Sequence, residues 1–417
     1  MTLKHLIGCA TLLLAVAAGA AEASFAAFEK RAQAGEGLSV VFFGGSLTYS
    51  ANASDPNVTG VRGLMADYLR ARYPRARFVF HDAAIGGTGS LLGAFRLERD
   101  VLAHRPDLVF LDFLCNDGTD EPNLEPTCAY EYILRTLIER GIPVEQMFFT
   151  FKFWAGKGFD PVKSLPRYSV YHRLAAAYGT PVGDVQRESL ARDLAGGQTT
   201  LDAVWPIDGA HPDDLGYRYF FEAVRAGFER GVKDGAVCRV PAKPVYGTLA
   251  DVKRTRLVDG SLPDGWRRSL TYRTSMWFDG LSSRWMGDVA AAKAGAAALT
   301  FTADCNFIGV FGEGDEQGLA FTLAEADNPV DTWSSSPGPG RLFIFRSRAL
   351  DDWTQGARRR TFTLTPAADG KGELHLESIL TATLVPAAPG TARATATSGT
   401  DKLEALDHGR GITDKKD

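Results

Sequence analysis

A serine, an aspartate and a histidine in glycine-containing segments have the chemistry needed for acyl transfer. Ser46 ends the run FFGGS, and Asp208 and His211 lie three residues apart in the loop DGAH. A histidine that takes a proton from a serine needs an acceptor to orient its second ring nitrogen, which a nearby carboxylate provides. Asp208 could instead cap the following helix. Asp213 and Asp214 can serve as that cap, so the pattern favours the catalytic interpretation.

Two further segments could supply neutral hydrogen-bond donors for a developing oxyanion. Gly86-Gly87 lies in AAIGGTGS, where the lack of a Cβ allows a sharp turn and a close backbone approach. Asn116, in CNDGT, offers a side-chain amide. Together with the Ser46 amide these groups would make three donors, and removing one such donor costs about 3–4 kcal/mol in the barrier.

The residues around Ser46 leave three interpretations to compare: a nucleophile on a turn, a ligand in a phosphate-binding loop, and a helix N-cap. The phosphate loop fails because no G-x-x-x-x-G-K-[ST] motif surrounds the serine. A dinucleotide site is disfavoured because Gly87, Gly89 and Gly93 are spaced one residue too widely. The G-x-S-x-G elbow is absent as well, since position 48 is threonine.

The elements that must position these residues alternate between residues 39 and 232. Runs rich in β-branched and aromatic residues predict strands, and segments with helical periodicity lie between them. Apolar strands separated by helices are typical of a parallel sheet covered on both faces, so we predict a three-layer α/β domain. Residues after such strands meet at the carboxyl edge of the sheet. The predicted strands are 39–43, 77–83, 107–113, 147–151 and 180–185, and the predicted helices are 61–73, 91–105, 128–141 and 168–179.

The pattern changes after residue 240. Period-2 segments interrupted by Gly, Pro, Asp and Asn predict an antiparallel β-sandwich. The end of the chain has too little apolar content to fold alone. The predicted organisation is a signal peptide at 1–23, an α/β domain at 24–240, a β-sandwich accessory domain at 246–386 and a disordered tail at 387–417.

In chain order, FGGSLT, AAIGGTGS, CND and DGAH resemble the four blocks of the SGNH, or GDSL-type, hydrolases. The resemblance covers about residues 38–230. It implies a flavodoxin-like α/β/α domain with a five-stranded parallel sheet. It also implies that Ser46 is the nucleophile, His211 the general base and then acid, and Asp208 the residue that orients His211. Gly87 and Asn116, with the Ser46 amide, would form the oxyanion hole.

Gly45 departs from the family pattern, because the best-known members have aspartate there. Position 45 lies outside the proton-transfer residues, so the departure bears on the substrate more than on the mechanism. The reaction that the resemblance implies requires no cofactor and no metal.

Composition and the N-terminus bound the setting of this chemistry. The net charge is −4 over 417 residues, with 46 basic and 50 acidic residues mixed along the chain, so we expect no nucleic-acid partner. A basic start, a short apolar core and small residues up to Ala23 predict a secretory signal peptide and hence a secreted or periplasmic protein without membrane insertion. Its removal leaves four cysteines, Cys115, Cys128, Cys238 and Cys305, which could pair or stay as buried thiols.

The leading functional hypothesis is a secreted serine esterase that removes acyl groups, above all acetyl, from an O-acylated polysaccharide or oligosaccharide. The accessory β-sandwich and the aromatic residues in FKFWAGKGF (151–159) favour a glycan substrate. Three alternatives stay open. They are a polysaccharide O-acetyltransferase with the same residues, a lipid or thioester hydrolase, and a non-catalytic carbohydrate-binding protein. The oligomeric state is left open.

Overall fold

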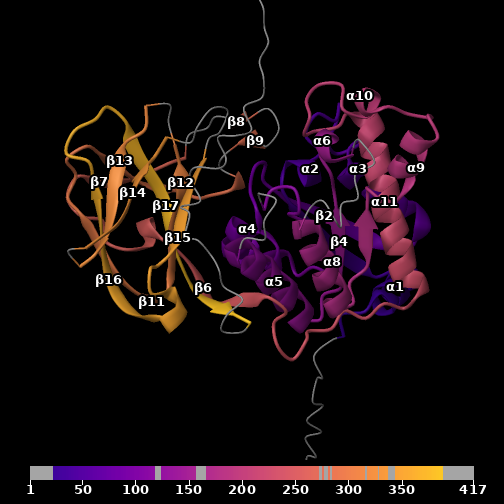
Figure 1. Ribbon diagram of the computed structural model, residues 1–417, viewed down its shortest axis with the longest axis horizontal. Coiled ribbons are helices and arrows are strands. Elements are labelled where there is room, and N and C mark those ends of the chain that lie inside the picture. Colours follow the sequence, from indigo (N-terminus) through magenta and orange to yellow (C-terminus); the bar gives the residue numbers. More distant parts are fainter. Residues whose placement is uncertain are drawn as a thin grey trace, which may run out of the picture.

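The computed structural model shows two adjoining domains, one with helices around a sheet and one built from strands (Figure 1). It describes residues 22–117, 124–155, 166–271, 275–276, 280–281, 284–314, 317–326, 328–336 and 343–387. Residues 1–21 of the predicted signal peptide and 388–417 of the predicted tail lie outside the described residues, as does the end of the aromatic segment, 156–159.

Five parallel strands of the described residues form one sheet, as predicted: β1 (Gly37–Gly44), β2 (Arg77–Ala84), β3 (Leu108–Asp112), β4 (Val144–Phe148) and β5 (Val182–Asp184). The strand order is β2-β1-β3-β4-β5. Gly44 pairs with Ala84 on one side and with Asp112 on the other. The first three strands therefore end at the same level, so the loops that carry Ser46, Gly87 and Asn116 start side by side.

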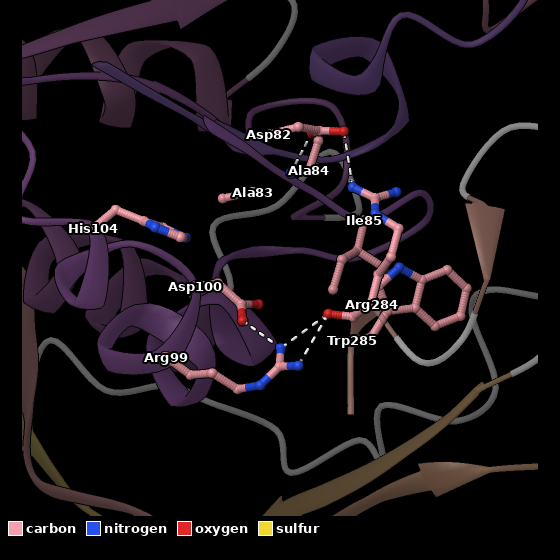
Figure 2. Close-up of a pocket in the computed structure, with 9 residues that line it drawn as sticks. All are labelled: Asp82, Ala83, Ala84, Ile85, Arg99, Asp100, His104, Arg284 and Trp285. Carbon is pink, nitrogen blue, oxygen red and sulfur yellow. Dashed lines mark hydrogen bonds and ion pairs between the residues drawn. The ribbon is translucent and has the colours of Figure 1, made fainter. Parts of the chain in front are cut away.

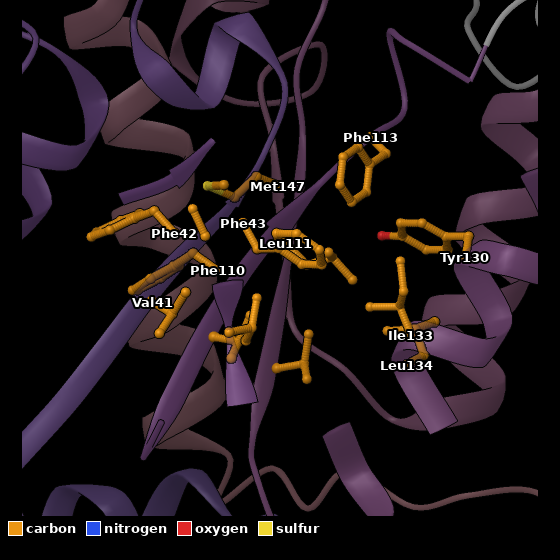
Figure 3. Packing of buried hydrophobic residues seen from close by; sticks show 14 of the residues in the cluster. Val41, Phe42, Phe43, Phe110, Leu111, Phe113, Tyr130, Ile133, Leu134 and Met147 are labelled. Carbon is orange, nitrogen blue, oxygen red and sulfur yellow. The ribbon is translucent and has the colours of Figure 1, made fainter. Parts of the chain in front are cut away.

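Helices cover both faces of this sheet. Neighbouring residues of a strand point to opposite faces. Phe42 stacks on Phe110 with 5.0 Å between ring centroids, whereas Phe43 lies on the other face of the sheet (Figure 3). Phe110 approaches Phe228 on the first face, and the Arg96 guanidinium lies over the Phe43 ring on the second. Both faces of the apolar strands are thus buried, which is why the strands lack a clear period-2 pattern of apolar and polar residues.

The predicted periodic segments form helices, and five short or terminal helices among the described residues were not predicted: Phe25–Ala34, Ser46–Tyr49, Lys152–Ala155, Ser189–Ala195 and Leu201–Val204. The larger helices are α1 (Phe25–Ala34), α3 (Val61–Arg72), α4 (Ser90–Asp100), α5 (Leu124–Glu139), α8 (Pro166–Tyr178) and α11 (Asp214–Lys233). The short helices of this domain are α2 (Ser46–Tyr49), η1 (Leu102–His104), α6 (Lys152–Ala155), α9 (Ser189–Ala195) and α10 (Leu201–Val204).

The fourth strand begins and ends three residues earlier than the prediction of 147–151. Two polar residues, Glu145 and Gln146, concealed its start, yet both are completely buried. Gln146 accepts a hydrogen bond from Tyr130 Oη at 2.8 Å and donates one to Thr180 Oγ1 at 2.6 Å. Because its amide is paired inside the core, a polar residue occupies a position where the sequence pattern calls for an apolar one.

The second domain is an antiparallel β-sandwich. In its described part, β15, β12, β17, β10 and β7 form one sheet in that order with β6 beside β17, and β11, β16, β13 and β14 form the other. Apolar residues of both sheets fill the space between them. The strands are β6 (Gly247–Arg256), β7 (Trp266–Ser269), β8 (Ser275–Met276), β9 (Gly280–Leu281), β10 (Val289–Lys293), β11 (Leu299–Cys305), β12 (Phe307–Glu313), β13 (Ala320–Glu325), β14 (Asn328–Ser334), β15 (Phe343–Ala349), β16 (Arg358–Pro366) and β17 (Glu373–Pro386), with 3-10 turns η2 (Leu257–Asp259) and η4 (Trp353–Gln355).

The two domains share a continuous apolar core. Phe95 of α4 stacks on Phe307 of β12 with 6.0 Å between ring centroids. The buried carboxylate of Glu131, on α5, accepts the backbone amides of Val245, Tyr246 and Gly247 at 2.5, 2.9 and 3.2 Å. These contacts fix the connection where β6 begins, so the β-sandwich is packed on the α/β domain and is not a freely tethered module.

The four cysteines that follow the predicted signal peptide are buried free thiols in this structure. Burial raises the pKa of the Cys128 thiol well above its usual value, so this thiol stays protonated. Among the helices that the structure describes, none is long and apolar enough to cross a membrane.

Candidate active site

The structure brings Ser46, His211 and Asp208 into one chain of hydrogen bonds. Ser46 Oγ lies 2.8 Å from His211 Nε2, and His211 Nδ1 lies 3.1 Å from Asp208 Oδ2. Ser46 is 5% exposed and His211 is 9% exposed, so both side chains are largely shielded from solvent. A serine, a base in contact with it and a carboxylate that orients the base form the arrangement that activates a hydroxyl for attack on a carbonyl.

Ser46 is presented by a sharp change from strand to helix. Strand β1 ends at Gly44, and the four-residue helix α2 begins at Ser46 itself. The N-cap of this helix is Gly45, without a side-chain capping bond. The N-cap interpretation of Ser46 is therefore wrong, and its hydroxyl is directed to His211.

The DGAH loop positions His211 through a compact turn. Asp208 Oδ1 accepts the backbone N–H groups of Ala210 and His211, each at 2.7 Å. Asp213 caps helix α11 by accepting the backbone N–H groups of the first turn. Asp208 is therefore free of capping duty, as predicted, and its second oxygen faces the imidazole.

Asp208 is held in its ionised form. Partial burial alone would raise the pKa of this carboxyl. The hydrogen bond from the His211 ring, the charge attraction to it and the backbone donors of His211 and Ala210 outweigh that effect and hold the pKa well below its usual value. An ionised acceptor stabilises the imidazolium that forms when His211 takes a proton.

Asn116 and the loop that carries Gly87 both approach Gly45, the residue before the Ser46 amide. A Cβ placed on Gly45 would lie 2.2 Å from Asn116 Oδ1 and 3.4 Å from the carbonyl oxygen of Thr88. Asn116 and the loop after β2 thus both approach the backbone immediately before Ser46. Gly87 in that loop has φ of +68°, a conformation that favours glycine.

This crowding gives a physical reason for glycine at position 45. Any larger residue, including the aspartate of better-known family members, would displace the Asn116 side chain or shift the strand end. The Asn116 side chain makes no hydrogen bond to the part of the chain that the structure describes, which leaves its amide available to a ligand.

Asp117 anchors the segment that carries Asn116. Its buried carboxylate accepts from the backbone N–H and the hydroxyl of Ser90, both at 2.6 Å, and from the Tyr171 hydroxyl. Arg167 donates to the Asp117 carbonyl oxygen. The network connects the loop after β3 to the start of α4 and to α8, and it thereby fixes the backbone next to Asn116.

Two further buried polar groups beneath the site are not evident from the sequence. Arg96 donates to the Gly44 carbonyl at 2.9 Å and to the Ala83 carbonyl, which joins the ends of β1 and β2. Thr48 Oγ1 donates to Asp112 Oδ2 at 3.2 Å. Arg96 lies 52 residues from Gly44 and 13 residues from Ala83, and Thr48 lies 64 residues from Asp112. An arginine or an aspartate within an apolar segment gives no indication of which residue it will contact.

Replacing Asp112 by asparagine is expected to raise the free energy of unfolding at pH 8, with little effect near pH 4. Burial raises the pKa of Asp112 to about 8, despite the hydrogen bond from Thr48. Between about pH 4 and pH 8 the folded state therefore binds more protons than the unfolded state, and stability falls as pH rises, by up to about 1.4 kcal/mol per pH unit. Asparagine does not titrate and removes this slope.

Chemical denaturation between pH 5 and pH 8 measures this effect. Asp67→Asn serves as the control, because the Asp67 side chain is 70% exposed on helix α3. Parallel pH dependences of stability for the wild type and Asp112→Asn would contradict the assignment.

A separate cavity of about 290 Å³ lies where the two domains meet (Figure 2). Its charged groups are paired: Arg284 Nη2 lies 2.8 Å from Asp82 Oδ2, and Arg99 Nη1 lies 2.5 Å from Asp100 Oδ1. None of the three hydrogen-bonded site residues lines it. The cavity marks a junction held by the ion pair between Arg284 and Asp82 and by hydrogen bonds from Arg99 to the Arg284 carbonyl. It is lined by Asp82, Ala83, Ala84, Ile85, Arg99, Asp100, His104, Arg284 and Trp285.

Two solved structures of a two-domain esterase are similar to this chain in fold. A two-domain esterase (CEX) active on acetylated mannans, co-crystallised with mannopentaose, has a TM-score of 0.68 and 18% identity over 85% of this chain and 93% of that chain. A second crystal structure of a two-domain esterase (CEX) active on acetylated mannans gives a TM-score of 0.64 and 18% identity over 85% of this chain and 94% of that chain. The acetyl xylan esterase AlAXEase gives 0.39 and 22% identity over 45% of this chain and 98% of that chain. A search of curated proteins found no match.

Residues 42–219 match the family model of the GDSL-like lipases/acylhydrolases. The match includes Ser46, Gly87, Asn116, Asp208 and His211, which the structure gathers at the carboxyl edge of the sheet. Residues 42–219 therefore form a GDSL-like lipase/acylhydrolase domain, which makes the chain an ester-hydrolysing serine hydrolase.

Proposed function

We propose that this chain removes acetyl groups from an O-acetylated polysaccharide or oligosaccharide after export from the cytoplasm, through an acyl-enzyme intermediate. One observation carries the chemistry. The hydroxyl of Ser46, the imidazole of His211 and the carboxylate of Asp208 are hydrogen-bonded in series. The predicted signal peptide supports the location, and it remains a prediction from the sequence.

The proposed reaction has two steps that use the same residues. Ser46 Oγ attacks the ester carbonyl carbon while His211 Nε2 takes the hydroxyl proton. The backbone amide of Ser46, the Asn116 side chain and the loop at Gly87 are placed to stabilise the tetrahedral oxyanion. His211 then returns the proton to the sugar oxygen, which leaves as an alcohol. Water attacks the acyl-enzyme with His211 again as base, and acetate and free Ser46 result.

An apolar surface beside the site supports a carbohydrate substrate. Phe153 is 57% exposed and Ile207 is 68% exposed. The two segments are joined, because the Lys152 amide donates to the Gly209 carbonyl at 2.9 Å. Exposed apolar side chains next to a reactive serine offer a flat surface for the apolar face of a sugar ring. The two-domain esterase of similar fold is active on acetylated mannans, which suggests the first substrate to test.

An acyl-length series of p-nitrophenyl esters, combined with acetate release from acetylated mannan and xylan, tests the proposal. We expect kcat/KM to be highest for acetate and to fall by about tenfold or more from acetate to octanoate, because Ser46 is largely buried and a small acyl group needs the least space to reach it. Free acetate should appear from at least one acetylated glycan.

Phe153→Ala is the matched variant for the glycan part of the proposal. It should raise KM for the acetylated glycan and leave p-nitrophenyl acetate hydrolysis unchanged. A preference for octanoate would indicate a lipid or thioester hydrolase instead. Acetyl transfer to a sugar hydroxyl in excess of free acetate would indicate an acetyltransferase.

A further inference from the structure

We propose that Asn52 is a positioning residue of this site. It holds the Asp208 carboxylate and keeps the DGAH loop (208–211) in place relative to Ser46. Asn52 Nδ2 donates to Asp208 Oδ2 at 3.0 Å and to the backbone carbonyl of His211 at 3.2 Å. This inference rests on the proposed roles of Ser46, His211 and Asp208. It adds a residue outside the four sequence blocks.

The location of Asn52 gives its amide a bridging role. Asn52 lies six residues after Ser46, whereas Asp208 and His211 lie about 160 residues later. The backbone near Asn52 is tied back to the nucleophile, since the Ala51 amide donates to the Ser46 carbonyl at 3.0 Å. Its two hydrogen bonds therefore connect the segment of the nucleophile to the loop of the base. They constrain the distance between Ser46 Oγ and His211 Nε2.

The backbone of Asn52 is held in a conformation that residues other than glycine rarely adopt. Its φ is +70°, and Ser50 has φ of +72°. Asparagine is among the few residues that tolerate this left-handed region. Such conformations are strained for most residues and persist where the surroundings hold them, often at functional sites. The Tyr217 hydroxyl donates to the Ala51 carbonyl at 2.7 Å and helps to fix the segment.

The amide completes the set of donors around Asp208. Backbone N–H groups of Ala210 and His211 occupy Oδ1, and Asn52 and the His211 ring share Oδ2. With both oxygens fixed, the carboxylate cannot rotate away from the imidazole. The Asn52 amide carries no charge and does not titrate, so it restrains Asp208 without competing for the proton of His211.

Asn52→Gly tests this role while preserving the left-handed backbone. We expect kcat for p-nitrophenyl acetate to fall about 10- to 100-fold, because a hydrogen bond to a charged group is lost, with KM little changed. The unfolding temperature should stay close to that of the wild type. A purely structural role predicts the opposite, namely a lower unfolding temperature and an unchanged kcat for the folded protein.

Asn52→Asp supplies a pH signature that a structural role would not produce. The introduced carboxyl faces Asp208 and lies near His211 and Tyr217. Arg62 acts to lower the pKa of Tyr217, and Asp214 is hydrogen-bonded to Ser54 of the same segment. Burial and the Asp208 charge raise the pKa of Tyr217 well above its usual value, so it stays protonated. At neutral pH the two carboxylates repel each other. As pH falls, the introduced carboxyl can bind a proton and donate to Asp208, so kcat relative to the wild type should rise.

Asn57→Asp, at an exposed asparagine of the same segment, is the control and should retain wild-type kcat. If Asn52→Gly and Asn52→Asp both keep kcat within twofold of the wild type while Ser46→Ala is inactive, the role of Asn52 is refuted and the proposed function stands. If Ser46→Ala is also active, the proposed function itself fails. A pH-independent ratio for Asn52→Asp would likewise overturn the assignment.

Discussion

Replacing Ser46 by alanine is expected to lower kcat for p-nitrophenyl acetate by about 10⁴-fold or more. The change removes the oxygen that lies 2.8 Å from His211 Nε2 and hence the atom that would form the acyl-enzyme. The oxyanion donors remain, and such donors together with binding sustain a residual rate about 10³–10⁴ above the uncatalysed reaction in a comparable triad. The variant should show no burst of p-nitrophenol.

The rate of Ser46→Ala must be compared with that of a serine that lies outside the hydrogen-bonded site. Ser54→Ala is suited to this purpose, because the Ser54 hydroxyl is exposed and donates to Asp214 at 2.6 Å. It should retain the wild-type rate. A Ser46→Ala protein that hydrolyses the ester as fast as the wild type would rule out Ser46 as the nucleophile.

The α/β fold could be predicted because its strands and helices carry local signals. Strands β1, β2 and β3 are apolar runs that end in glycine-containing or polar segments, and their common end level follows from parallel pairing. Strand β4 was misplaced because Glu145 and Gln146 are buried within it. A buried polar residue can be recognised only once its partner is known, and the partner of Gln146 lies on another element.

The candidate site residues could be identified from the sequence because each lies shortly after a predicted strand or before a predicted helix in a short polar motif. Asn52 carries no such motif, since its function depends on contacts with a loop about 160 residues away. The same is true of Asp117, whose partners Ser90 and Tyr171 lie on different helices. The reason for glycine at position 45 also became apparent only from the position of Asn116.

The contacts in the core that the two domains share could not be predicted from the sequence. Alternation predicted a separate β-sandwich, and the sandwich is present, but no periodicity indicates that Phe307 stacks on Phe95 or that Glu131 holds the connection. Contacts between the domains are made by the same types of apolar residue that fill the interior of each domain. Their partners are therefore not encoded in any local pattern.

Replacing Asp208 by asparagine is expected to lower kcat by about 10⁴-fold while leaving the fold intact. An asparagine amide facing His211 Nδ1 would make that nitrogen an acceptor and place the ring proton on Nε2, where it faces Ser46 Oγ. His211 could then no longer accept the serine proton, which is the tautomer effect known from the serine-protease triad. Stopped-flow or steady-state rates with p-nitrophenyl acetate measure the loss.

The pH dependence of stability distinguishes this variant from one that is simply misfolded. The folded state holds the pKa of Asp208 below its usual value, so the carboxylate contributes stability above about pH 4 that is lost as pH falls further. The stability difference between the wild type and Asp208→Asn should therefore shrink in acid. Asp213→Asn, which changes only the cap of α11, should keep both kcat and stability. If Asp208→Asn were as active as the wild type, His211 would have to be oriented by its backbone contacts alone, and the carboxylate would serve the loop rather than the reaction.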